Sequence, residues 1–320
     1  LPRLIGAMAA MDLMLTGRTV PGKLARRMGL ADEVVPERHL LHAAEALLQK
    51  RPRHKLALWK RLLAAPGVRK LVANTMRKQV KAKANPDQYP APYRIIDLWQ
   101  RRSSYEKEAR SLGELLTGRT SRNLVRVFLL SEELKSKGRA AEHDIKHVHV
   151  VGAGVMGGDI AVWAAHKGFT VTLQDRSTEA IGRAVKRAHD FYKKKYRRDE
   201  RQIESAMDRL MPDPHGYGLG HADLVVEAII EDEAIKQSVF KDIESKVSKQ
   251  CLLATNTSSI PLEIIGKALK DPSRLVGLHF FNPVSKMQLV EIVRGEQTSD
   301  AALARARAFT ASIERLPLDV

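Results

Sequence analysis

Cysteine, aromatic residues and long apolar runs are all scarce in this sequence. With a single cysteine, Cys251, the chain can form no internal disulfide, which fits a reducing compartment. Aromatic residues are 5% of the sequence, and those within residues 1–140 are scattered, so they form no stacking platform for nucleic acid. No apolar run approaches the roughly 20 residues that a membrane-spanning helix needs, so we expect no membrane span. The 320 residues leave room for about two globular domains.

Acidic residues are scarce in one part of the chain only. The formal net charge is +17, and the whole excess lies in residues 1–140, because residues 141–320 carry as many acidic as basic side chains. A basic helical region of this kind can face nucleic acid, a membrane surface, an anionic cofactor or an acidic partner chain. It can equally be a solvated helical surface, and the missing aromatic platform argues against nucleic acid. A basic surface for nucleic acid or a partner in residues 1–140 therefore stays as one alternative function.

Three glycines directly after a predicted strand indicate a dinucleotide-binding site. A β-rich run, residues 147–151, leads into Gly152, Gly154 and Gly157, and an amphipathic helix and a second apolar strand follow. The first glycine permits a tight turn, the second lets the backbone approach a pyrophosphate, and the third allows close contact between helix and strand. The helix N-terminus then presents unpaired N–H groups to the phosphates. A glycine-rich turn without a ligand is the alternative, but all the flanking elements agree with a dinucleotide site.

Asp175, at the end of the second strand, predicts which dinucleotide binds. A carboxylate here can accept both ribose hydroxyls and would repel the 2′-phosphate of NADP, so we expect NAD as the cofactor. The neighbouring Arg176 could pair with such a phosphate and is the feature that speaks against this choice. Beyond Asp175, apolar strand patterns alternate with helical patterns up to residue 320. This alternation predicts an α/β fold with a Rossmann-type, doubly wound parallel sheet, preceded by a mainly helical region.

Polar residues at the ends of the later apolar runs are the candidates for chemistry, because ligands of such sheets bind beyond the carboxyl ends of the strands. A lone histidine in an apolar strand, such as His279, is more often a satisfied core residue than a catalytic group. Glu291, twelve positions on in the next apolar run, changes this interpretation. A buried carboxylate needs a partner, and one that is hydrogen-bonded to an imidazole fixes its tautomer and raises its basicity. We therefore expect His279 and Glu291 to be candidate catalytic residues, and we expect no metal ion in the site.

Four segments, in this order and spacing, resemble the NAD-binding domain of L-3-hydroxyacyl-CoA dehydrogenases: VVGAGVMGGDIA, VVEAIIED, ATNTSSIPL and GLHFFNPVSKMQLVEI. The resemblance covers about residues 145–320 and implies oxidation of the 3-hydroxyl group of an acyl-CoA by NAD. It implies that His279 is the general base, that Glu291 orients it, and that Ser258 hydrogen-bonds the substrate oxygen beside the nicotinamide.

The same resemblance implies further binding residues. The implied NAD contacts are Gly152, Gly154, Met156, Gly157, Asp175, Glu231, Lys236, Ser258 and Asn282. For Glu231 and Lys236 the alternative is a solvated helix start. A contact with the CoA moiety is implied at Arg198, for which the alternative is a solvated basic helix.

The first part of the chain resembles a different family. Residues 1–36 look like the end of an enoyl-CoA hydratase (crotonase) domain, and NPDQYPAPYRIID and SRNLVRVFLLSEELK resemble the linker of multifunctional fatty-acid oxidation enzymes. We therefore expect a crotonase C-terminal remnant in residues 1–48, a helical linker in 49–144 and the NAD-binding domain in 145–320. The pairing resembles the α subunit of fatty-acid oxidation complexes. It implies an acyl-CoA substrate, and a thiolase subunit and a homo-oligomer as partners of the complete protein.

Two departures from that family bear on the function. In the family the two hydratase glutamates precede the segment that matches LPRLIG, and the helical C-terminal domain of the dehydrogenase follows the segment that matches PLDV. We therefore expect the chain to be an excerpt of a bifunctional enzyme, and a non-catalytic NAD-binding fragment is the alternative. A bacterial cytoplasm fits the arrangement best, with the mitochondrion or peroxisome as alternatives.

Overall fold

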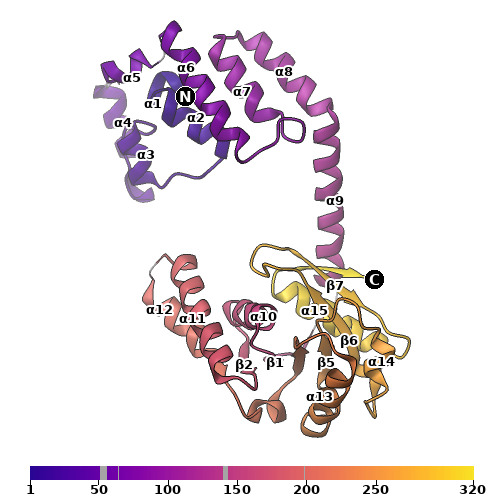
Figure 1. Ribbon diagram of the computed structural model, residues 1–320. Helices are drawn as coiled ribbons and strands as arrows, with labels where there is room; N and C mark the ends of the chain where they lie inside the picture. The colour runs from indigo at the N-terminus through magenta and orange to yellow at the C-terminus, as the bar shows by residue number, and fades with distance from the viewer. Residues whose placement is uncertain (51–55, 64, 140–142, 198) are drawn as a thin grey trace. The chain divides into compact units, whose positions relative to one another are not determined.

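Helices form the first part of the chain, whereas a sheet organises the second part (Figure 1). The computed structural model describes residues 1–50, 56–63, 65–139, 143–197 and 199–320. Its contacts divide the chain into two units, Leu1–Val127 and Phe128–Val320. No helix of these described residues is long and apolar enough to cross a membrane.

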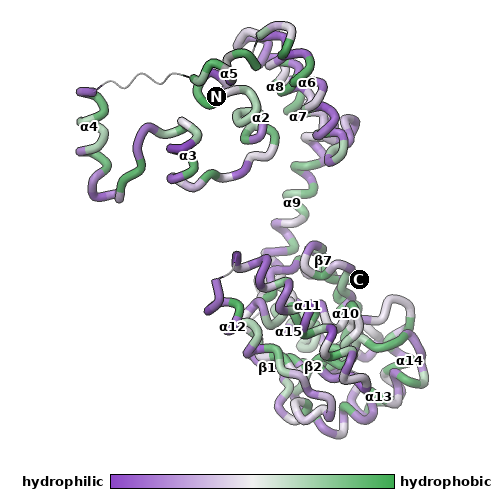
Figure 2. The backbone as a smooth tube through the Cα atoms, turned by 60° about the vertical axis from the view of Figure 1, so that its left-hand side comes forward, coloured by the Kyte–Doolittle hydropathy of each residue, from purple (hydrophilic) through white to green (hydrophobic). Residues whose placement is uncertain are grey.

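Unit 1 (Leu1–Val127) consists of short helices around a small core. The helices are α1 (Pro2–Ile5), α2 (Ala7–Thr16), α3 (Gly22–Met28), η1 (Glu37–His39), α4 (Leu40–Lys50), α5 (Leu58–Leu62), α6 (Pro66–Lys81), α7 (Ala91–Gln100), α8 (Tyr105–Thr117) and the first part of α9 (Arg119–Arg139). The buried core residues are Met11, Val72, Ala73, Met76 and Ile96. Figure 2 shows hydrophobic and hydrophilic stretches alternating along α6 and α7, which is typical of helices that bury one face, and these two helices supply most of the core residues of this unit.

Unit 2 (Phe128–Val320) is organised by an eight-stranded sheet in the order β3-β2-β1-β4-β5-β6-β7-β8. The strands are β1 (His147–Val151), β2 (Thr170–Gln174), β3 (Leu210–Pro212), β4 (Leu224–Glu227), β5 (Leu252–Thr255), β6 (Leu275–Phe280), β7 (Leu289–Val293) and β8 (Leu316–Asp319). The helices are α10 (Val155–His166), α11 (Thr178–Lys195), α12 (Glu200–Asp208), η2 (Tyr217–His221), α13 (Glu233–Lys246), α14 (Leu262–Gly266), η3 (Pro272–Arg274) and α15 (Asp300–Ser312). The strand order reverses between β1 and β4, which is the switch point of a doubly wound sheet. The predicted α/β class with a Rossmann-type sheet is confirmed.

Two strands run against the predicted direction. The sequence patterns predict a parallel sheet throughout, but β7 pairs antiparallel with β6, and β8 runs parallel to β7. The short connection between β6 and β7, residues 281–288, explains this difference, because a parallel crossover needs a dozen or more residues. The edge strand β3 was also not predicted, and it ends on Pro212, a residue that sheets tolerate at their edges.

Helices cover both faces of the sheet and create two cores. Buried side chains of α10, α11 and α15 pack on one face, and those of α13 and α14 pack on the other. All residues of β4 and β5 are consequently buried, which is why these strands are continuous apolar runs in the sequence. The packing holds β1, β2, β4, β5 and β6 parallel, so their carboxyl ends meet at one edge. The predicted site residues follow these ends.

Candidate active site

The glycine loop between β1 and α10 has the shape that a pyrophosphate requires. Gly152 has φ +107°, a conformation that side chains rarely adopt, and a Cβ there would lie 2.5 Å from the carbonyl oxygen of Ala228. A Cβ at Gly157 would collide with the carbonyl oxygen of Gly152. Gly154 is exposed and has open space around its missing Cβ, so the backbone can be approached at the N-terminus of α10. The described residues therefore fit a dinucleotide.

Asp175, directly after β2, holds the glycine loop through a hydrogen bond to its backbone. One carboxylate oxygen accepts the N–H of Ala153 at 2.7 Å, and the other accepts the N–H of Ser177 at 2.9 Å. Each oxygen retains lone pairs that can accept ribose hydroxyls. The predicted contact Met156 is partly buried and packs against the core. Asp175, which was predicted to bind the ribose, therefore also stabilises the conformation of the glycine loop.

A buried ion pair lies at the carboxyl end of β4. Lys236, on α13, is 1% exposed, and its Nζ donates to Oε1 of Glu227 at 2.6 Å. Glu227 ends β4, is 0% exposed, and also accepts the N–H of Ile229 and the hydroxyl of Thr255, both at 2.7 Å. The interpretation of Lys236 as a solvated residue is therefore wrong. The sequence reasoning missed Glu227, although a single carboxylate that ends the apolar run DLVV is a signal that could have revealed it.

Glu231 connects this ion pair to Ser258. Its carboxylate lies 3.3 Å from the Nζ of Lys236, and it accepts the hydroxyl of Thr257 at 2.9 Å and the N–H of Ser258 at 2.7 Å. The Oγ of Ser258 donates to the same carboxylate at 3.1 Å. Burial by itself would raise the pKa of Glu231, but the donors from Ser258, Thr257 and Lys236 outweigh it and hold the pKa below its ordinary value. Three predicted site residues, Glu231, Lys236 and Ser258, thus form one network.

His279 and Glu291 face each other across the antiparallel pair of β6 and β7. They are directly opposite in the register, and the Nδ1 of His279 lies 2.8 Å from Oε2 of Glu291. The two side chains are 22% and 30% exposed, so the pair is accessible from one side. The ring of Phe281 packs against the imidazole, with 4.7 Å between the ring centroids. The structure therefore brings together the two residues that the sequence reasoning paired.

The loop after β6 carries the predicted NAD contact Asn282, which is exposed. Asn256, after β5, accepts the N–H of Phe280 through its side-chain oxygen at 2.9 Å and so ties the strand ends together. Arg315, which precedes β8, donates to the carbonyl oxygen of Val284 at 2.8 Å and stacks on Trp163 of α10 at 3.6 Å. The sequence reasoning assigned no role to Asn256 and missed Arg315, because their partners are distant in the chain.

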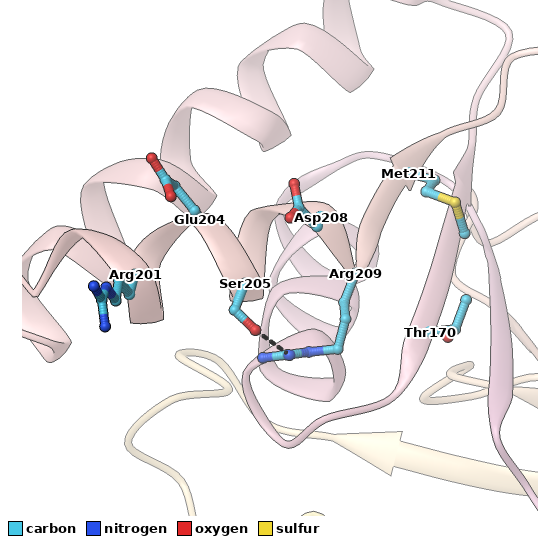
Figure 3. Close-up of a pocket in the computed structure, with 7 residues that line it drawn as sticks. All are labelled: Thr170, Arg201, Glu204, Ser205, Asp208, Arg209 and Met211. Carbon is cyan, nitrogen blue, oxygen red and sulfur yellow. Dashed lines mark hydrogen bonds between the residues drawn. The ribbon is translucent and has the colours of Figure 1, made fainter.

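Arg198, the candidate CoA contact, is outside the described residues. The hollow in Figure 3 is lined by Thr170, Arg201, Glu204, Ser205, Asp208, Arg209 and Met211. Thr170 begins β2, so this hollow lies at the amino end of a strand and away from the glycine loop. Among the described residues, no group of three or more His, Cys, Asp or Glu is placed to hold a metal ion.

Comparison with known proteins identifies the family. Residues 147–320 match the family described as 3-hydroxyacyl-CoA dehydrogenase, NAD binding domain. The chain belongs to this family. The prediction of NAD as the cofactor is thereby confirmed, and the glycine loop and Asp175 lie within the matched region.

Solved structures of hydroxyacyl-CoA dehydrogenases are similar to the same part of the chain. A 3-hydroxybutyryl-CoA dehydrogenase from Escherichia coli K12 is 36% identical with a TM-score of 0.53, over 55% of this chain and 38% of that one. An (S)-3-hydroxybutyryl-CoA dehydrogenase from Ralstonia eutropha is 34% identical with a TM-score of 0.53, over 55% of this chain and 64% of that one. The dehydrogenase part of multifunctional enzyme 1 from C. elegans is 31% identical with a TM-score of 0.52, over 60% of this chain and 48% of that one. The chain thus spans less than two thirds of the length of each.

Proposed function

We propose that the chain supplies the NAD-binding half of an active site that oxidises L-3-hydroxyacyl-CoA to 3-oxoacyl-CoA in fatty-acid β-oxidation. The hydrogen-bonded pair of His279 and Glu291 carries the proposal, because it lies at the same sheet edge as Ser258 and the glycine loop. Membership of the 3-hydroxyacyl-CoA dehydrogenase family supports the reaction class.

His279 and Glu291 have the arrangement of a general base and its orienting group. An ionised carboxylate can only accept, so Nδ1 carries the proton of the 2.8 Å bond and Nε2 keeps its lone pair. Nε2 is therefore the atom that takes the proton of the substrate's 3-hydroxyl group, and Glu291 stabilises the imidazolium that forms. Bound NAD supplies the hydride acceptor.

Ser258 is proposed to hydrogen-bond the substrate oxygen. Its hydroxyl, on an exposed residue, can turn from Glu231 to the substrate, because Glu231 keeps the donors of Thr257 and Lys236 and the N–H of Ser258. The proposed NAD contacts are Gly152, Gly154, Met156, Gly157, Asp175, Glu231, Lys236, Ser258 and Asn282. Lys236 would make this contact only after leaving Glu227 in part, since its Nζ is buried in the arrangement described.

The wider setting of the proposal is a bifunctional hydratase and dehydrogenase that acts with a thiolase subunit and as a homo-oligomer. The crotonase resemblance of residues 1–36 supports it, and so does the similarity to the dehydrogenase part of a C. elegans multifunctional enzyme. In this setting residues 1–48 are a crotonase remnant, 49–144 a linker and 145–320 the NAD-binding domain.

The test measures, in the complete protein, NADH oxidation by acetoacetyl-CoA together with NADH binding. We expect His279→Ala to lower turnover roughly 10²–10⁴-fold while NADH binds as in the wild type, because general-base catalysis contributes about that much. His189→Ala, which removes an exposed histidine of α11, is the matched control and should keep full turnover. Near-normal turnover of His279→Ala would refute the assignment.

A second candidate function is a chain that binds NAD without catalysing the reaction. It is favoured by the coverage of the matched structures, which is 38% and 64% for the two bacterial enzymes. This candidate predicts that the wild-type 320-residue chain binds NADH but does not oxidise it with acetoacetyl-CoA. Measurable turnover by this chain would exclude it.

A further inference from the structure

An acidic residue lies in the helix whose N-terminus faces the cofactor phosphates. Asp159 is four positions after Val155, the first residue of α10, and its side chain is 29% exposed. A negative charge this close to a helix N-terminus opposes the binding of a pyrophosphate, which carries negative charge itself. Burial raises the pKa of Asp159, while the guanidinium of Arg187 acts in the opposite direction and favours the ionised form. The ionised form of Asp159 would therefore weaken the binding of the cofactor pyrophosphate.

Arg187 reaches this charge from the neighbouring helix. It lies on α11, and its Nη2 donates to the carbonyl oxygen of Gly154 at 2.9 Å. Its Nε lies 3.9 Å from Oδ1 of Asp159 and makes no hydrogen bond within the part of the chain that the structure describes. The guanidinium is thus held between the glycine loop and the acidic side chain.

Gly158 provides the space for this arrangement. It follows the three glycines of the dinucleotide motif, and a Cβ there would lie 2.5 Å from Nη2 of Arg187 and 3.2 Å from the Cβ of Ala184. Glycine at this position therefore lets α11 approach α10 and lets the guanidinium lie against the helix surface. The pyrophosphate functions of Gly152, Gly154 and Gly157 do not require this fourth glycine.

We propose that Arg187 is a positioning residue for cofactor charge in this NAD-binding domain: it neutralises Asp159 so that the N-terminus of α10 accepts the dinucleotide phosphates. The inference rests on NAD binding and does not depend on the dehydrogenase reaction. Arg187 acts through Asp159, so its importance should disappear when the acidic charge is removed. A residue that only packs the two helices together would not behave in this way.

The experiment measures the Kd of NADH by fluorescence titration of the chain at low and high salt. We expect Arg187→Met to weaken binding about fivefold at low ionic strength and less at high salt, because exposed charges near a helix end are screened. Arg187→Lys should bind close to the wild type, since it keeps the charge. Arg183→Met removes the same charge one turn earlier on α11 and should have a smaller effect.

The double variant Arg187→Met/Asp159→Asn distinguishes a charge effect of Arg187 from a role in packing the two helices together. We expect it to regain the wild-type affinity, and we expect Asp159→Asn alone to bind NADH at least as tightly as the wild type. Arg187→Met should also weaken the binding of ADP-ribose, which carries the pyrophosphate, but should leave the binding of adenosine unchanged. Failure of Asp159→Asn to rescue Arg187→Met would overturn the proposal, as would equal losses for Arg187→Met and Arg183→Met. If Arg187→Met does not fold, weaker NADH binding by Asp159→Asn than by the wild type would overturn the proposal. NADH binding by the wild-type chain tests the NAD assignment separately from this proposal.

Discussion

Two lysines of α13 form ion pairs of almost the same length that differ in burial, and this difference predicts very different contributions to stability. Lys236 lies 2.6 Å from Glu227, and the two side chains are 1% and 0% exposed. Lys246 lies 2.7 Å from Asp242, and these side chains are 46% and 57% exposed. The first pair joins α13 to β4 and is buried, whereas the second lies within α13 and is exposed to solvent.

Replacement of each lysine by methionine keeps most of the aliphatic side chain and removes the charge. Lys236→Met leaves the carboxylate of Glu227 buried without its cation, which costs about 3–5 kcal/mol in other proteins. The two remaining 2.7 Å hydrogen bonds to Glu227 place the expected loss near the lower end, at about 3 kcal/mol. Lys246→Met should cost about 0.5 kcal/mol or less, because solvent screens an exposed pair.

The assay is urea unfolding in which hydrogen exchange of peptides from β1, β4 and β5 reports on the sheet of unit 2. Lys236→Met should lower the unfolding midpoint well below that of the wild type, and Lys246→Met should leave it nearly unchanged. Equal losses for the two variants would refute the reasoning, because burial would then have no influence on the pair. A small loss for Lys236→Met alone would mean that water reaches Glu227.

Two further predictions concern the same sheet edge. Because the folded pKa of Glu231 is lowered from its ordinary value of 4.5, its contribution is present above that pH and is lost as the pH falls through the lower folded pKa. After allowance for 40% exposure, Glu231→Gln should cost about 1 kcal/mol of unfolding free energy at pH 7 and progressively less as the pH falls below 4.5 and through the folded pKa; a pH-independent loss in urea titrations would contradict this. Arg315→Met should speed hydrogen exchange of residues 281–288 about tenfold, through loss of the bond to Val284, and equal acceleration throughout the sheet would show a general destabilisation instead.

Local steric demands explain how much of the site could be predicted from the sequence. Gly152, Gly154 and Gly157 lie where a turn, an open backbone and a close helix contact require them, and their spacing within six residues makes the motif visible in the sequence, although the residue closest to Gly152, Ala228, is distant in the chain. The pairing of His279 with Glu291 was also accessible, because only a short connection separates their strands. A carboxylate and an imidazole within two successive apolar runs have few other partners available.

The structure decided where charges are buried and which distant residues neutralise them. Lys236 has the sequence context of a solvated helix start, yet packing of α13 against the sheet buries it beside Glu227. Asp159 and Arg187 meet only because α11 packs closely on α10 at Gly158. Helix packing of this kind depends on side chains far apart in the chain, so no local pattern reveals it.

The sequence by itself determined the α/β class, the dinucleotide loop, the cofactor and the candidate catalytic pair. These properties follow from periodicity and from steric requirements within short stretches of chain. Only the tertiary structure decided the reversed direction of β7 and β8, the ion-pair network of Glu227 and Lys236, and the contact of Arg187 with the glycine loop. The physical reason is that strand direction and charge burial are set by the packing of whole elements, which the identity of neighbouring residues does not specify.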